Sequence, residues 1–174
     1  MIELPPTLDG RPARIIMVCM GNICRSPAAE VVLRHKLGAA GIDAIAVDSA
    51  GTGGWHAGDG ADPRSRAAWE RRGYRGGHTA RQFQAEWFDE RDLILAMDVD
   101  NLTTLRARTR TEAQVRRITL LRAFDPAVQD ADARDLTHLE VPDPYYGGAE
   151  GFEHMLDLIE AACDGLVARL RIRS

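Results

Sequence analysis

The chain has 174 residues, of which 45% are hydrophobic, so it is long enough for one compact domain and too short for two full ones. Its formal net charge of -4 argues against a protein that works mainly by binding nucleic acid or an anionic membrane, because such proteins usually carry a basic excess. Three cysteines are too few and too oddly numbered for a disulfide framework. The sequence has no membrane span or signal peptide pattern, and we expect a cytoplasmic protein.

Short apolar runs alternate with helical patterns along the chain. Residues 1–13 are expected to form a flexible extension before a domain at 14–174, and the first strand is predicted at 15–18, a continuous apolar run. Further strands are predicted at 45–48, 93–97 and 118–121, and helices at 28–37, 63–72, 99–108, 112–115 and 152–170. This order predicts a single three-layer α/β domain, Rossmann-like, with a central, mainly parallel four-stranded sheet flanked by helices.

Two helix starts are marked by a capping residue followed by proline, at Ser26-Pro27 and at Asp62-Pro63. The pattern predicts that Ser26 and Asp62 are N-cap residues and that Gly73 ends the second helix. Residues 125–143 are polar and show no sustained period, so we predict a long surface loop there.

Cys19 and Arg25 stand at the two ends of a seven-residue loop between the first strand and the helix after it. The N–H groups of such a loop can point inward, the helix N-terminus adds partial positive charge, and Arg25 can donate two hydrogen bonds to one tetrahedral anion. The same field favours the thiolate form of Cys19, and the Ser26 hydroxyl is placed to donate to it. Asn22 tolerates left-handed backbone and can help to fix the loop. The loop therefore predicts a phosphate site above a cysteine nucleophile.

The segment 18–27, followed by Ala29-Glu30, resembles the phosphate-binding loop of the low-molecular-weight protein tyrosine phosphatases, and bacterial members most closely. The resemblance extends from about residue 14 to about residue 170, with its two most specific motifs at opposite ends of the chain. Its further matches, in the family's order, are Asp48–Thr52, Trp55-His56, His78–Gln82, Met97-Asp98 and Asp143–Gly147.

The resemblance implies a phosphotyrosine phosphatase that needs no metal and no cofactor. In the mechanism it implies, the Cys19 thiolate forms a phosphocysteine intermediate, Arg25 binds the phosphate, and Asp143 acts first as general acid and then as general base. The rest of the phosphate-binding loop would be Met20, Gly21, Asn22, Ile23, Cys24 and Ser26. The implied partner is a phosphotyrosine-containing protein, with no role for nucleic acid or membrane. We expect a monomer, and weak self-association and export without a signal peptide stay open.

The resemblance also implies roles for residues around the loop. Ser49 would brace the loop with Asn22, and the supporting hydrogen-bond network would consist of Glu30, Asp48, His78 and Asp98. The substrate cleft would be formed by Trp55, Tyr145 and Tyr146, deep enough for an aryl phosphate but not for the shorter serine phosphate. In the family, the cysteine at the position of Cys24 traps an oxidised nucleophile as a disulfide. The alternative is that Cys24 is simply a small buried residue.

Three other functions remain open. An arsenate reductase of the same fold would need further cysteines downstream, and residues 75–101 contain none. A protein-arginine phosphatase is closer, but such relatives tend to carry threonine where this chain has Ile23, whose bulk favours a flat phenyl ring. A non-catalytic phosphotyrosine-binding module would be expected to have lost Cys19, Arg25 or Asp143, and all three are present.

Overall fold

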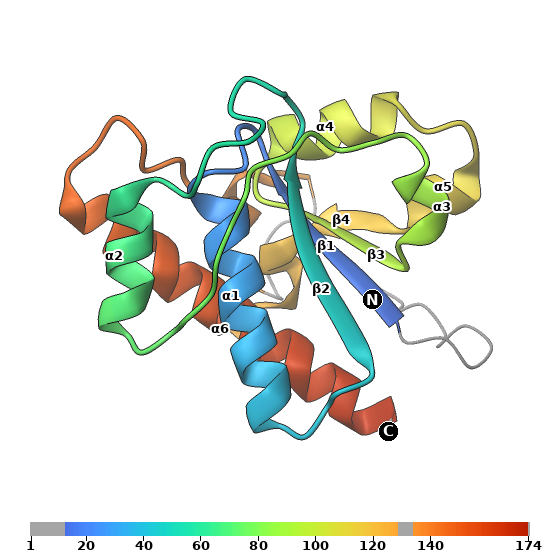
Figure 1. The fold of residues 1–174 in the computed structure, drawn as a ribbon. Helices are drawn as coiled ribbons and strands as arrows, with labels where there is room; N and C mark the ends of the chain where they lie inside the picture. Colours follow the sequence, from blue (N-terminus) through green and yellow to red (C-terminus); the bar gives the residue numbers. More distant parts are fainter. Residues whose placement is uncertain (1–12, 129–133, 174) are drawn as a thin grey trace.

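The computed structural model describes residues 13–128 and 134–173, and its centre is a parallel sheet with the strand order β2-β1-β3-β4 (Figure 1). The strands are β1 (Ala13–Cys19), β2 (Ile45–Gly51), β3 (Leu93–Ala96) and β4 (Ile118–Leu120). The predicted α/β class with four parallel strands is confirmed. Ala13, which the prediction placed in the extension, is the first residue of β1, and residues 1–12 lie outside the described part of the chain.

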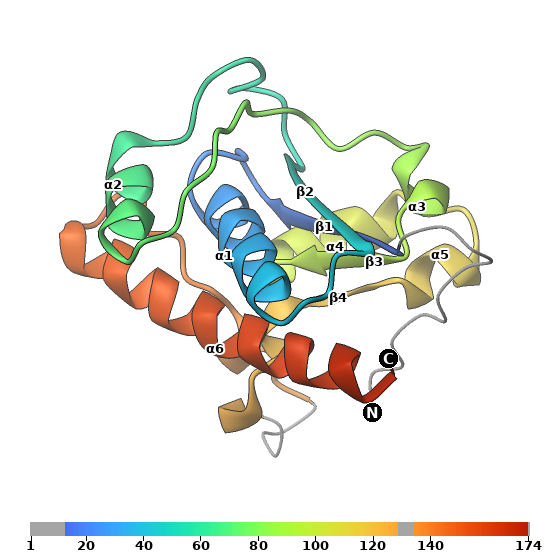
Figure 2. The same ribbon diagram turned by 60° about the horizontal axis from the view of Figure 1, so that its bottom comes forward.

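Helices cover both faces of the sheet (Figures 1 and 2). One side carries α1 (Arg25–Ala39), α2 (Pro63–Arg71) and α6 (Ala149–Arg173), and the other carries α3 (Trp87–Glu90), α4 (Val99–Ala107) and α5 (Glu112–Arg116). Side chains alternate across a strand, so Ile15 and Met17 of β1 join the core under α1 and α6, whereas Ile16 and Val18 join the core under α3 and α4. Among the helices of the described ranges, none has the length and apolar character that crossing a membrane requires.

The two predicted N-caps have different outcomes. Asp62 caps α2 as predicted, because its carboxylate accepts a hydrogen bond of 2.8 Å from the Arg64 N–H. Ser26 is not a cap, because it lies inside α1. The helix begins at Arg25, with Cys24 at the cap position. The Ser26 hydroxyl instead lies 3.0 Å from the Cys19 sulfur. In the described residues no side chain caps α1, so its first N–H groups remain free to face an anion.

Most described residues of the predicted surface loop at 125–143 are exposed or half-buried, but Asp125 and Val141 are buried within it. Asp125 is only 2% exposed, because its carboxylate pairs with Arg122 at 3.2 Å and accepts a bond from the Ala127 N–H. Val141 is fully buried, and its N–H donates to the Met97 carbonyl at 2.7 Å. Two short 3₁₀ helices, Pro126–Val128 and Thr137–Leu139, lie between these anchors, and residues 129–133 are outside the described ranges.

Gly165 lies where α6 passes close to the segment after β4. A Cβ at this position would lie 1.9 Å from the Phe124 carbonyl oxygen, so Gly165→Ala must push α6 away. We expect this change to lower the free energy of unfolding by about 1–3 kcal/mol, measured by urea denaturation. The matched control is Gly38→Ala in α1, where the added Cβ has no described atom within 4 Å apart from its chain neighbours and the backbone of its own helix. It should be neutral or stabilise by up to about 1 kcal/mol, and equal destabilisation by both changes would contradict the close approach.

Candidate active site

The carboxyl ends of β1, β2 and β3 meet at one edge of the sheet, where open parallel sheets bind ligands. Cys19 ends β1 and lies opposite Gly51, the last residue of β2, while Asp98 follows β3. The Thr52 N–H donates to the Cys19 carbonyl at 2.8 Å. A Cβ at Gly51 would lie 2.6 Å from the Met20 carbonyl oxygen, so glycine lets β2 approach the loop that follows Cys19.

The sulfur of Cys19 has two hydrogen-bond donors beside it. The Asn22 N–H donates to it at 3.3 Å, and the Ser26 hydroxyl oxygen lies 3.0 Å away. Since that oxygen accepts a bond of 2.8 Å from the Asn22 side-chain amide, the Ser26 proton can point at the sulfur. Two donors of this kind stabilise a negatively charged sulfur.

Asn22 has a positive φ of 57° and is held there by contacts on every side. Its amide group donates to Ser49, whose hydroxyl donates to Glu30 at 2.5 Å, and its side-chain oxygen accepts from the Arg81 N–H. The Asn22 carbonyl lies 2.6 Å from Nε2 of His78, and because a carbonyl only accepts, Nε2 carries the proton. Burial lowers the pKa of His78 and so favours the neutral ring. Ser49, Glu30 and His78 therefore converge on Asn22.

Asp48 reaches the loop only indirectly. Its carboxylate binds Arg81 at 2.5 Å and Arg91 at 2.7 Å, and the backbone of Arg81 bonds Asn22. The Trp87 ring packs on both guanidinium groups, with centroid distances of 4.5 Å to Arg81 and 5.1 Å to Arg91. Asp48 thus fixes the segment that holds Asn22 and reaches the loop through Arg81.

Arg25 is 3% exposed and points its guanidinium toward three oxygen acceptors. It donates to Asp98 at 2.5 Å and to the Val141 carbonyl at 3.1 Å, and it lies 3.5 Å from Asp143. Burial disfavours its charge, but Cys19, Asp98 and Asp143 outweigh that effect and raise the pKa of Arg25 above its ordinary value. Asp98 is in turn held by capping α4, where it accepts from a backbone N–H at 2.7 Å.

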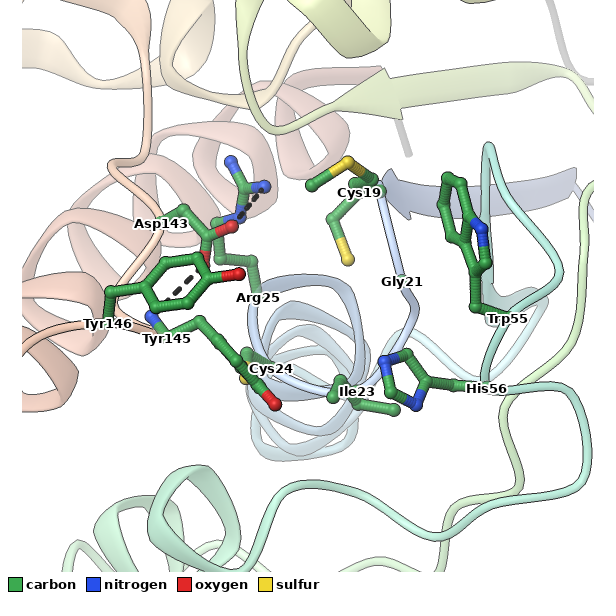
Figure 3. A pocket seen from close by; sticks show the side chains of 11 residues that line it. Cys19, Gly21, Ile23, Cys24, Arg25, Trp55, His56, Asp143, Tyr145 and Tyr146 are labelled. Atoms are coloured by element: carbon green, nitrogen blue, oxygen red, sulfur yellow. Dashed lines mark hydrogen bonds and ion pairs between the residues drawn. The ribbon is translucent and has the colours of Figure 1, made fainter.

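Cys19, Arg25 and Asp143 line one pocket of about 190 Å³ (Figure 3). Trp55 and His56 lie on one side of it and Asp143 and Tyr145 on the other, with the sulfur of Cys19 between them. The pocket is lined by Cys19, Met20, Gly21, Ile23, Cys24, Arg25, Trp55, His56, Asp143, Tyr145 and Tyr146. Trp55 is 73% exposed and Tyr146 is 96% exposed, so both aromatic rings stand at the rim.

A family model described as low molecular weight phosphotyrosine protein phosphatase matches residues 14–173. The chain belongs to this family. A low molecular weight protein-tyrosine-phosphatase of Streptomyces coelicolor is 50% identical over 159 residues, which cover 91% of this chain and 93% of the relative. Low molecular weight protein-tyrosine phosphatase A of Mycobacterium tuberculosis is 41% identical over 157 residues, covering 89% and 90%.

Solved structures of related phosphatases share the fold. The crystal structure of YfkJ from Bacillus subtilis has a TM-score of 0.82 and 34% identity, covering 95% of this chain and 98% of that one. DARP, a Drosophila arginine phosphatase, has a TM-score of 0.79 and 28% identity, covering 90% and 97%. The fold is therefore shared by proteins named for two different phosphorylated residues.

Several residues of this phosphatase site were missed by sequence reasoning. Val141 acts through its carbonyl, which any residue supplies, so its type carries no signal. Arg64, Arg91 and Trp87 contact the site through other residues. His56 was quoted within a motif but received no role, although it lines the pocket and pairs with an exposed aspartate at 3.1 Å. In the described ranges, no three His, Cys, Asp or Glu side chains gather as a metal site.

The second cysteine of the phosphatase loop, Cys24, is 4% exposed and is a free thiol, as is Cys19. Burial, with smaller contributions from Asp62, Cys19 and Asp143, raises its pKa from 9.0 to about 12. Between pH 9 and about pH 12 the unfolded chain loses the Cys24 proton while the folded chain keeps it. The contribution of this thiol to the free energy of unfolding therefore falls as pH rises through this range.

Alkylation of Cys24 tests this shift. At pH 10 an ordinary thiol is about nine tenths ionised, whereas about one hundredth of Cys24 is. In the native protein, we expect iodoacetamide to modify Cys24 slowly, and the rate should still rise with pH above about pH 10. In urea, the rate should have levelled off by that pH. Peptide mass spectrometry gives both rates. A native rate with the same plateau as the urea rate would contradict the raised pKa.

Proposed function

We propose that this phosphatase hydrolyses phosphotyrosine in protein substrates through a phosphocysteine intermediate on Cys19. One observation carries the proposal: the Cys19 sulfur lies within a pocket between an uncapped helix N-terminus, the Arg25 guanidinium and the Asp143 carboxyl group. These are a nucleophile, an anion site and an acid around one space. Family membership supports the same activity, because relatives that are 50% and 41% identical are named protein-tyrosine phosphatases.

In the first step, the Cys19 thiolate attacks phosphorus in line with the bond to the aryl oxygen. The S–P bond forms as the P–O bond breaks, and Asp143 gives its proton to the leaving phenolate. Arg25 and the N–H groups at the start of α1 hold the three equatorial oxygens, on which negative charge is spread in the transition state.

In the second step, water attacks the phosphocysteine. Asp143, now ionised, takes a proton from the water, the S–P bond breaks, and inorganic phosphate and the Cys19 thiolate are released. The Ser26 hydroxyl and the Asn22 N–H stabilise this thiolate as a leaving group. Asp143 is partly exposed at the mouth of the pocket, where both the leaving phenol and the incoming water can reach it.

The pocket favours an aryl phosphate over an alkyl one. Exposed rings of Trp55 and Tyr146 stand at its rim with Tyr145, and Cys19, which is 3% exposed, lies below them. A tyrosine side chain spans from rim to sulfur and stacks on these rings, whereas a serine phosphate is held back by the shorter side chain. Ile23 lines the same pocket and adds apolar surface beside a phenyl ring.

Hydrolysis of matched phosphopeptides with a metal chelator present tests the proposal. We expect kcat/KM for a phosphotyrosine peptide to exceed those for the phosphoserine and phosphoarginine peptides by about 100-fold or more. A phosphoarginine preference would overturn the assigned substrate and the role of Ile23. Tight binding of phosphotyrosine without release of phosphate would show a binding module.

A further inference from the structure

Arg64 links the phosphate-binding loop to the segment that carries Asp143. It lies at the start of α2 and is outside the lining of the pocket. Its Nη1 donates to the Tyr145 carbonyl at 3.0 Å, and its guanidinium packs 5.3 Å from the centre of the Tyr145 ring and 4.8 Å from that of Phe152. One side chain therefore holds both the backbone and the ring of Tyr145.

The other side of Arg64 is fixed to the phosphate-binding loop. Asp62 accepts from Nε of Arg64 at 3.1 Å and from Nη2 at 2.8 Å, which sets the orientation of the guanidinium plane. The Asp62 N–H donates to the Ile23 carbonyl at 2.8 Å, and the Ser65 hydroxyl donates to the Cys24 carbonyl at 2.9 Å. The position of Arg64 is thus set by the loop that surrounds Cys19.

The connection ends on the carboxyl group of Asp143. The Tyr145 N–H donates to Oδ1 of Asp143 at 3.1 Å, while the Tyr145 carbonyl is held by Arg64. Oδ2 of Asp143 is left facing Arg25 and the pocket. A shift of Tyr145 would therefore rotate or withdraw the oxygen that faces the pocket.

We propose that Arg64 is a positioning residue for Asp143, which sets the distance between the general acid and the phosphate held on the loop. The inference rests on the proposed function. Proton transfer requires this distance to be correct within a fraction of an ångström, and a misplacement of about 1 Å can cost roughly 100-fold in rate. The Arg64 side chain is about half exposed, so its ion pair with Asp62 adds little to the stability of the fold.

Aryl phosphates with different leaving groups separate positioning of the acid from a general defect. Dinitrophenolate leaves without a proton, whereas phenolate needs one. We expect Arg64→Met to lower kcat/KM, which reports on the first step, about tenfold or more on phenyl phosphate and by less than about twofold on dinitrophenyl phosphate. The inhibition constant of inorganic phosphate should stay unchanged, because Cys19 and Arg25 are untouched. The matched control is Arg66→Met, in the same helix, where Arg66 pairs with Glu70 at the surface and both rates should be unchanged.

A double-mutant cycle with Asp143→Asn completes the test. If Arg64 acts through Asp143, Arg64→Met should lower kcat/KM on phenyl phosphate no further once the acid has been removed. An equal loss on both substrates, no loss on either, or a full additional loss in the Asp143→Asn background would overturn the inference. If Arg64→Met fails to fold by near-UV circular dichroism, Arg64→Lys is judged by the same criteria. Failure of the unsubstituted enzyme and of Arg66→Met to hydrolyse any aryl phosphate would instead overturn the proposed function.

Discussion

Replacing Cys19 by serine is expected to lower kcat for a phosphotyrosine peptide by about 10⁴-fold or more, because removal of a nucleophile leaves only binding and electrostatic stabilisation. The hydrogen-bond partners of the atom at this position are the Ser26 hydroxyl and the Asn22 N–H, and neither is a base that could take the proton of a serine hydroxyl. They favour a thiolate, which is already ionised, and do nothing to remove a proton from an alcohol.

Binding should survive this change. Arg25 and the N–H groups at the start of α1 do not depend on the sulfur, so we expect the dissociation constant of the phosphopeptide, measured by calorimetry, to change by less than about tenfold. The matched control is Cys163→Ala, which removes a thiol that is fully buried in the core under α6 and should leave kcat unchanged. Retention of more than about a hundredth of the activity in Cys19→Ser would exclude Cys19 as the nucleophile.

Strands and helices of this fold could be predicted where an apolar run or a helical pattern is bounded by residues that favour the start or end of an element. The run at 93–97 contains buried β3, and Asp62-Pro63 marks the start of α2, because each signal reports a local preference that packing supports. The run at 45–48 fell short of β2, which continues to Gly51. Its last residues are small or polar and enter the strand because they pair with the end of β1, a contact that no local pattern contains.

Ser26 shows why a correct local rule can give a wrong result. A serine before proline favours an N-cap, but the hydroxyl faces Cys19 instead, and the helix begins at Arg25. At 125–143, polar composition suggested exposure, yet Asp125 is buried by its pairing with Arg122. In both cases a hydrogen bond or ion pair made in the folded structure outweighs the tendency of the residue type.

Residues of the candidate site could be predicted where a side chain within a motif reaches the pocket. Cys19 and Arg25 were found from the seven-residue loop, and Asp143 from the family resemblance. Val141 and Tyr145, by contrast, offer carbonyl oxygens to Arg25 and Arg64. Every residue has such an oxygen, so only the folded backbone shows which ones are used.

The second large effect is expected for Arg25→Lys, which we expect to lower kcat by about 10³-fold or more, a loss comparable with that of other arginines that stabilise a transferring phosphoryl group. Phosphate should also bind less tightly, as an increased inhibition constant for inorganic phosphate. The matched control is Arg106→Lys in α4, where Arg106 donates to the Ile118 carbonyl away from the pocket, and its kinetics should be unchanged.

This substitution keeps the charge and changes only the geometry. The planar guanidinium of Arg25 uses Nη1 for Asp98 and Val141 and still presents Nη2 to the pocket, whereas lysine has one nitrogen for both tasks. The carboxylate of Asp98, mostly buried beside it, would hold that nitrogen away from the phosphate. If Arg25→Lys kept kcat within about tenfold of the unsubstituted enzyme, positive charge alone would be sufficient. The separate contacts of Nη1 and Nη2 would then have no part in catalysis.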